Sequence, residues 1–232
     1  MTGLRQRQKV DRDRRILEAA AELFRSAGYE GATMEAIAEH ARVSPGTIYN
    51  YYQNKGDLLV AIAAMEVNEV LAAGERVVER PATIASATVD GLFRIYFEHS
   101  LTYLNKEMWR HAMAISLQQP ESPSGSAYSN LDTCLSKQVC RLIARLQSAG
   151  LIRRDVDTVA IGELLFNSMD RMFVNFLKSE STKLSELKRR VAIQTRVLLG
   201  EIESVPKSTK ATSSAKAVVK GRTSQRRSAQ LL

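Results

Sequence analysis

The chain has 232 residues, of which 44% are hydrophobic and 25% are charged, and its formal net charge is +8 at pH 7. This length and apolar content predict one large or two small globular domains with a buried core. No run reaches the ~18 apolar residues of a membrane span, and the first apolar run, from Ile16 to Phe24, is too amphipathic for a signal peptide. We therefore expect a cytoplasmic protein without membrane contact.

Charge is distributed unevenly along the chain. Residues 1–15 contain six basic and two acidic residues, and residues 206–232 contain seven basic residues and no acidic one, so the segment between them is slightly acidic. Basic arms of this kind attract phosphate backbones in a salt-sensitive way, although each can also be a solvated flexible end. Low hydrophobicity and uniform charge predict a disordered basic tail over residues 204–232.

Apolar residues recur at helical spacing nearly throughout the chain, which predicts an all-α fold of about nine helices. The first helix is predicted over residues 11–27, and we expect Gly28 to end it. Its apolar face contains Ile16, Leu17, Ala20, Leu23, Phe24 and Ala27.

Two short helices joined by a tight turn are predicted next. Thr33 can cap the first of them through its hydroxyl. An apolar stripe then follows at helical spacing, formed by Met34, Ile37, Ala38 and Ala41. After a turn at Arg42 and Val43, Ser44 is a strong N-cap candidate. Pro45 suits the first position of the second helix, where no amide hydrogen is needed.

The second short helix has two different sides, because each residue advances by about 100 degrees. Ile48 and Tyr52 fall on the side that faces the protein, and Gly46, Thr47 and Asn50 fall on the opposite side. A helix in a DNA major groove needs small or polar residues toward the base edges and longer donors toward the phosphate walls. This layout predicts a DNA-reading unit.

Longer donors flank that unit. Tyr49 and Tyr51 lie on its two sides, and Asn54 is placed to cap the following helix, with Asp57 three residues later. Lys55 falls in the first turn of that helix, where a cation opposes the helix dipole. Its position therefore favours a phosphate partner over helix stabilisation.

At these residues the chain resembles the TetR family of transcriptional regulators. The matching positions are Gly28, Tyr29, Thr33, Ile37, Ala38, Val43, Ser44, Gly46, Thr47, Ile48, Tyr49 and residues 52–58. The resemblance covers residues 11–71 and implies a helix-turn-helix DNA-binding domain there. A ligand-binding and dimerisation domain over residues 72–203 is then implied.

The resemblance also implies roles for individual residues. Gly46 and Thr47 would approach bases or adjoining phosphates, Tyr49, Tyr51 and Lys55 would clamp phosphates, and Thr33 would meet a phosphate at the start of its helix. The predicted DNA-binding residues are Thr33, Arg42, Ser44, Pro45, Gly46, Thr47, Tyr49, Asn50, Tyr51 and Lys55. Tyr52 stands where the family often has phenylalanine, which leaves open whether its hydroxyl reaches DNA.

Six further helices are predicted along the rest of the chain. They cover residues 55–78, 83–105, 107–118, 126–149, 158–178 and 181–203, with a loop over 119–125 and Asp157 as the cap of the fifth. Cys134 and Cys140 fall on different faces of one helix, so we expect buried free thiols rather than a mutual disulfide. A redox-sensing pair is the alternative.

The last two predicted helices suggest a dimer. The helix over residues 158–178 is apolar around most of its surface, which requires cover on two sides. The helix over residues 181–203 repeats apolar residues at Leu184, Leu187, Val191 and Leu198. Two such helices from each of two subunits would form a four-helix interface, as the resemblance also implies. A homodimer fits a palindromic double-stranded DNA operator with half-sites about 34 Å apart or a multiple of it.

Aromatic and Met residues of the second domain could line a cavity for a small-molecule effector, although such residues are more often plain core. Two polar groups, His111 and Asp170, lie near them and could orient a ligand. The predicted ligand-binding residues are Phe93, Phe97, Met108, Trp109, His111, Met113, Asp170 and Met172.

The function that follows is a sequence-specific, ligand-responsive transcriptional regulator. By the resemblance, a dimeric repressor would leave its operator when a ligand favours a conformer with wrongly spaced reading heads. The alternatives are an activator of the same family and an architectural protein that binds DNA without sequence choice. The sequence has no P-loop, Gly-x-Ser-x-Gly, Cys-x-x-Cys or paired Glu-x-x-His motif. We therefore expect no enzymatic activity, no cofactor and no metal site.

Overall fold

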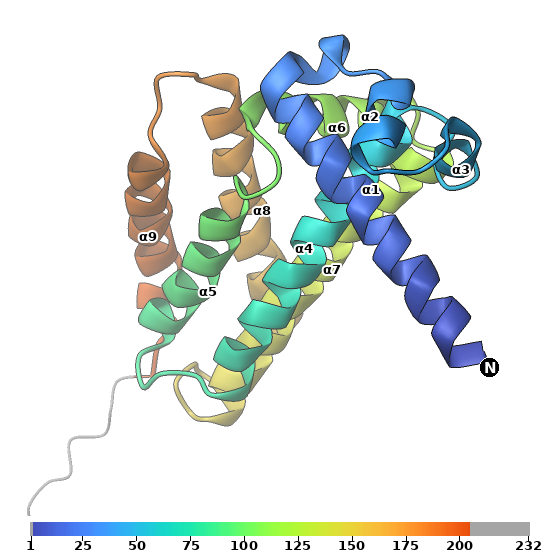
Figure 1. The fold of residues 1–232 in the computed structure, drawn as a ribbon. Helices are drawn as coiled ribbons and strands as arrows, with labels where there is room; N and C mark the ends of the chain where they lie inside the picture. The colour runs from blue at the N-terminus through green and yellow to red at the C-terminus, as the bar shows by residue number, and fades with distance from the viewer. Residues whose placement is uncertain (1, 205–232) are drawn as a thin grey trace, which may run out of the picture.

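A computed structural model describes residues 2–204 as a helical fold (Figure 1). Its helices are α1 Thr2–Gly31, α2 Met34–His40, α3 Pro45–Tyr49, α4 Lys55–Glu79, α5 Ala85–His99, α6 Lys106–Gln118, α7 Pro123–Ser148, α8 Thr158–Lys178 and α9 Leu184–Gly200. The predicted all-α fold is therefore confirmed. The predicted disordered tail lies outside the described residues, apart from Ser204.

The fold has two parts joined by one long helix. The short helices α2 and α3 pack together beside α1 and form a small head, while α5 to α9 form a larger bundle (Figure 1). Helix α4 contacts α1, α5, α6 and α7, and it passes without a break through residues 71 and 72, where the two domains were predicted to meet. Its length makes it a rigid connection between the head and the bundle.

Helix α1 begins earlier than predicted. It starts at Thr2 rather than near residue 11, so the basic N-terminal segment is helical and is not the flexible arm considered from the sequence. Arginine, lysine and glutamine are good helix formers, and this segment extends a helix that is already held by packing. Gly28 interrupts the helix with a φ of 76°, a conformation that favours glycine, before one further turn ends at Gly31.

Three other helix boundaries also differ from the prediction. Helix α5 ends at His99, because Asn105 caps α6 by accepting a hydrogen bond from the Met108 amide. Helix α7 begins at Pro123, since the Ser122 side chain caps it and proline suits the first helical position. Helix α9 covers only Leu184–Gly200, and the chain after it forms an isolated antiparallel bridge between Ile152 and Glu203.

The bundle helices α7 and α8 approach closely at Gly162. A Cβ atom at this position would lie 2.6 Å from the Cα atom of Cys140, so only glycine fits without displacing a helix. Cys140 is half-buried, Cys134 is exposed, and both thiols are free. The expectation of a buried thiol was therefore wrong for Cys134, which faces solvent on the outer side of α7.

None of the helices in residues 2–204 is both long enough and apolar enough to cross a bilayer.

Candidate functional site

The turn between α2 and α3 is fixed by local hydrogen bonds. Thr33 caps α2 by accepting a hydrogen bond from the Ala36 amide at 3.1 Å. Arg42 has a φ of 55°, the left-handed conformation that turns the chain between the two helices. Ser44 Oγ accepts a hydrogen bond from the Thr47 amide at 3.2 Å, and Pro45 occupies the first turn of α3. The predicted caps are confirmed.

Helix α3 has the predicted orientation. Ile48 is fully buried, whereas Pro45, Gly46, Tyr49 and Asn50 are exposed. An added Cβ at Gly46 would meet no atom within 4 Å, so open space lies in front of this residue. The outer side of α3 is therefore free to approach a partner.

The hydroxyl groups near this surface differ in their availability. Thr47 is half-buried, and its hydroxyl lies 2.8 Å from that of Ser44. Tyr49 donates a hydrogen bond to Glu35 at 3.2 Å, and the half-buried Tyr51 lies under the Lys9 ammonium, 5.9 Å from the ring centre.

Tyr52 faces α1, which answers the question left open by the sequence. Its hydroxyl donates a hydrogen bond of 2.6 Å to Asp13 Oδ1. Burial, followed by this hydrogen bond, raises the pKa of Tyr52 above its usual value. The hydroxyl that distinguishes Tyr52 from phenylalanine therefore joins α1 to the end of α3.

Lys55 occupies a different environment from the one predicted. Its ammonium donates hydrogen bonds to the carbonyls of Tyr29 at 2.8 Å and Glu30 at 3.1 Å, and it lies 4.9 Å from the centre of the Tyr29 ring. These contacts give Lys55 a stabilising role that the sequence did not favour, while its predicted phosphate contact stays a prediction. Lys55 lies at the start of its own helix but satisfies carbonyls at the end of α1.

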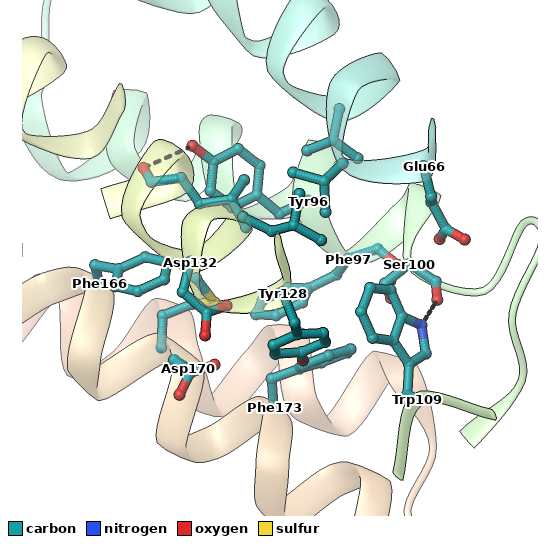
Figure 2. Close-up of a pocket in the computed structure, with 15 residues that line it drawn as sticks. Glu66, Tyr96, Phe97, Ser100, Trp109, Tyr128, Asp132, Phe166, Asp170 and Phe173 are labelled. Atoms are coloured by element: carbon teal, nitrogen blue, oxygen red, sulfur yellow. Dashed lines mark hydrogen bonds between the residues drawn. The ribbon is translucent and has the colours of Figure 1, made fainter. Parts of the chain in front are cut away.

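A second candidate site is a cavity in the bundle, lined by residues of α4 to α8 (Figure 2). The cavity volume that water-sized molecules can occupy is about 60 Å³. A single water needs roughly 10–15 Å³ of such volume. The residues that line it are Glu66, Val67, Val70, Tyr96, Phe97, Ser100, Trp109, Tyr128, Leu131, Asp132, Leu135, Phe166, Met169, Asp170 and Phe173.

The structure brings three of the predicted ligand-binding residues to this cavity, namely Phe97, Trp109 and Asp170. The other five lie outside it. Phe93 and Met108 are buried in the core, and His111 stacks on the Tyr29 ring at 4.6 Å.

Met113 and Met172 face separate surface grooves. The rotation of each helix about its own axis decides which of its side chains reach the cavity, and the spacing of apolar residues does not fix this rotation. On α6, Trp109 points into the cavity while its neighbour Met108 points into the core.

Sequence reasoning missed two of the three acidic residues in the cavity, Glu66 and Asp132. A signal for Glu66 existed, because it stands between Ile62 and Val70 at intervals of four residues, on the buried stripe of α4. A charged residue on such a stripe is rarely buried without a partner or a function.

The cavity carboxyl groups have raised pKa values. Burial raises the pKa of Glu66 to about 7, although Glu66 Oε2 accepts a hydrogen bond from the Tyr103 amide at 3.3 Å. Burial, and then the charge of Asp170, raise the pKa of Asp132 to about 7. The pKa of Asp170 is also raised, mainly by burial. At neutral pH the cavity therefore has a partly protonated set of acids.

Stability is expected to depend on the protonation of Glu66. The folded state holds this proton more tightly than the unfolded state does, so its stabilising effect is complete below about pH 4.5 and is lost as the pH rises through about 7. Urea unfolding should show that the free energy of unfolding of the unchanged protein decreases from pH 5 to pH 8. In Glu66→Gln this decrease should be smaller by about 2 kcal/mol. The exposed control Glu163→Gln should behave like the unchanged protein. Equal decreases in all three proteins would contradict the raised pKa.

Helix α6 lies between the cavity and the head. On its cavity side, Trp109 Nε1 donates a hydrogen bond to the Ser100 carbonyl at 2.5 Å. On its other side, His111 stacks on Tyr29, and Ile115 packs closely against Gly56 at the start of α4. A displacement of α6 would therefore reach both α1 and α4.

Two further hydrogen bonds connect the head to the bundle. The Ser124 hydroxyl, in the first turn of α7, donates to Asp57 Oδ1, and the Arg25 guanidinium donates to the Thr102 carbonyl at 2.8 Å. Asp57 also accepts a hydrogen bond from the Gln53 amide at 3.0 Å, next to the end of α3. The position of the head is thus set by contacts with α6 and α7 as well as by α4.

Known proteins share the sequence of the head. Residues 16–62 match the family model of bacterial regulatory proteins of the tetR family. Over 65 residues the chain is 40% identical to the HTH-type transcriptional repressor KstR of Rhodococcus jostii. This match covers 28% of this chain and 31% of KstR. It is 27% identical over 158 residues to the HTH-type transcriptional regulator UidR of Escherichia coli, covering 66% of this chain and 75% of UidR.

The fold is also shared with solved structures. The Thermus thermophilus FadR, a TetR family transcriptional repressor solved in complex with lauroyl-CoA, aligns with a TM-score of 0.63 and 22% identity, covering 84% of this chain and 98% of FadR. The sequence match to KstR spans only about a third of that protein's length. Residues 16–62 therefore form a head of the tetR family of bacterial regulatory proteins, and the described helices share the fold of a TetR family repressor.

Proposed function

We propose that the protein is a sequence-specific DNA-binding transcriptional regulator, a homodimeric repressor that a small ligand releases from its operator. The observation that supports this most strongly is the outer side of α3, where exposed small and polar residues are held outward by the buried Ile48. Such a helix fits a major groove, which admits one α-helix and presents a distinct donor and acceptor pattern for each base pair.

The DNA-binding surface would consist of two kinds of contact. Gly46, Thr47 and Asn50 would lie toward base edges, and Tyr49 and Tyr51 would lie toward phosphates, with the amide groups at the start of α2 and α3 near the backbone. Thr33, Arg42, Ser44 and Pro45 complete the surface at the starts of α2 and α3 and the turn between them. A phosphate contact by Lys55 would require its ammonium to leave the carbonyls at the end of α1.

Helices α8 and α9 would form the dimer interface. Four large apolar side chains on these helices are about half exposed or more: Val159 at 55%, Leu164 at 48%, Ile193 at 49% and Val197 at 70%. Ile193 and Val197 lie four residues apart and therefore on one face of α9, and exposed apolar surface of this kind marks interaction sites. A symmetric dimer through this face would present two copies of α3 to one palindromic duplex.

Ligand binding in the cavity would be transmitted through α4 and α6. Helix α4 contributes Glu66, Val67 and Val70 to the cavity and begins beside α3, while α6 contributes Trp109 and contacts both Tyr29 and Gly56. The FadR relative binds lauroyl-CoA, but the acidic lining of this cavity argues against an anionic acyl-CoA as the ligand here. The ligand must bind the two states of the dimer unequally to shift DNA affinity.

A selection of bound genomic fragments with the full chain, followed by one substitution, tests this function. Thr47→Ala should lower the affinity for a selected fragment by about tenfold, and the affinity for random DNA much less, because a base-edge contact is lost while phosphate contacts remain. The control Thr133→Ala changes an exposed threonine on α7 and should alter neither affinity. Equal losses of Thr47→Ala on both DNAs would argue against base reading by α3. Failure to enrich any fragment would favour an architectural role.

A further inference from the structure

The charged residues that line the cavity are all acidic. Glu66 enters it from α4, Asp132 from α7 and Asp170 from α8, and no lysine, arginine or histidine is among the described residues that line it. The basic side chains Arg110, Arg171 and Lys178 line a separate groove between α6 and α8. Figure 2 shows the Asp132 and Asp170 carboxyl groups pointing toward each other. Three helices therefore contribute acidic groups to the lining of one cavity, Asp132 and Asp170 at one end and Glu66 at the other (Figure 2).

Glu66 provides an independent sign of a missing partner. Its side chain is only 1% exposed, yet its Oε1 atom has no hydrogen-bond partner within the described part of the chain. Leaving a buried polar atom unpaired destabilises the folded protein, and the destabilisation is larger for a charged group. Such a group is retained at a functional site when a ligand supplies the missing interaction.

The walls of the cavity are aromatic. Phe173 stacks with Phe97 at 6.2 Å between ring centres and meets Trp109 edge to face at 5.8 Å, with Tyr128 and Phe166 completing the lining. The Tyr96 hydroxyl is already engaged, because it donates a hydrogen bond to Gln138 at 2.8 Å. Aromatic faces attract cations, and aromatic cages with nearby carboxylates suit ammonium groups. Neither feature favours an anion.

We propose that this cavity binds an organic cation, an ammonium group attached to a small aromatic or aliphatic body. The positive charge would lie between Asp132 and Asp170, and the apolar body would pack on Trp109 and Phe173 toward Glu66 at the other end of the cavity (Figure 2). Asp170 also borders the outer groove between α6 and α8, which gives the ligand a route from solvent. Binding of the cation in the cavity does not depend on the proposed DNA-binding function. Only the release of DNA by the bound cation rests on that function.

Three probes of similar shape and different charge test this proposal directly. They are benzyltrimethylammonium, the neutral neopentylbenzene and the anionic phenylmethanesulfonate. Trp109 is the only tryptophan in the chain, so its fluorescence reports events in the cavity. At about pH 8, where Glu66 and Asp132 are mainly ionised, the cation should cause a saturable change and bind at least about tenfold more tightly than either other probe. Isothermal titration calorimetry should give the same order.

Substitutions in the cavity locate the binding site. Asp132→Asn and Asp170→Asn keep the size of the side chain and remove its charge, so each should weaken cation binding by about tenfold or more. Glu163→Gln removes an exposed charge from the same helix as Asp170 and should leave binding unchanged. Thermal unfolding shows whether each variant is folded. If one variant does not fold, the comparison of the three probes on the unchanged protein still decides.

The outcomes separate this proposal from the DNA-binding function. Equal or tighter binding of the neutral or anionic probe, no saturable response to the cation, or unchanged cation affinity in both Asp→Asn variants would overturn the proposal. Operator binding is measured separately without any probe. Operator binding with no cation binding would refute the cation site and leave the regulator intact, whereas cation binding without operator binding would refute the regulator alone.

Discussion

Replacing Gly46 by aspartate is expected to abolish operator binding while leaving the fold intact. Space in front of Gly46 is open, and an acidic residue in the first turn of a helix interacts favourably with the helix dipole, so stability should be unchanged or slightly higher. On DNA, however, the carboxylate would face base edges and phosphates. A like-charge contact costs several kcal/mol, which corresponds to a loss of affinity of roughly 100- to 1,000-fold.

Two measurements make this prediction specific. Fluorescence anisotropy with a selected operator should show the loss of affinity, and thermal unfolding should show an unchanged or higher melting temperature. Gly46→Ala, which adds a side chain without a charge, should keep most of the affinity. If Gly46→Asp binds the operator as well as the unchanged protein, then α3 does not face DNA.

Val197→Asp is expected to convert the dimer to a folded monomer. Val197 is 70% exposed in the single chain, so a carboxylate there stays hydrated in the monomer and should not disturb folding. In a symmetric interface the same substitution buries two unpaired charges, each at a cost of several kcal/mol. A monomer can bind only one half-site at a time, so its affinity for the operator should fall by about 100-fold or more.

Sedimentation equilibrium gives the decisive mass for this prediction. Leu4→Asp places the same charge on another exposed apolar residue, at the N-terminal end of α1, far from α9 (Figure 1). This control should remain dimeric. A dimeric Val197→Asp would show that α9 lies outside the interface, and a monomeric unchanged protein would contradict the dimer itself.

The head could be predicted in detail because its structure depends on neighbouring residues. The caps at Thr33, Ser44 and Asn54 each bind an amide three residues later, so a short stretch of sequence contains the whole interaction. The orientation of α3 follows from the same short range, since one buried residue, Ile48, determines which side faces out. Local hydrogen bonds and helical spacing were therefore sufficient to predict the structure of the head.

The cavity could not be predicted in the same way, because its lining depends on how five helices are rotated against each other. Trp109 and Met108 are neighbours in the sequence, yet only Trp109 reaches the cavity. Asp132 and Asp170 come together only through the packing of α7 on α8, and Lys55 finds the Tyr29 carbonyl across 26 residues. Contacts of this range have no signature in a single sequence.

Two copies of α3 are expected to bind one symmetric duplex. The most direct test is the stoichiometry and footprint of the complex between the full chain and a fragment selected from genomic DNA. We expect an even number of protomers on a palindromic site, with half-sites separated by about 34 Å or a multiple of it. A single protomer on an asymmetric site, or equal affinity for every duplex at low salt, would contradict it.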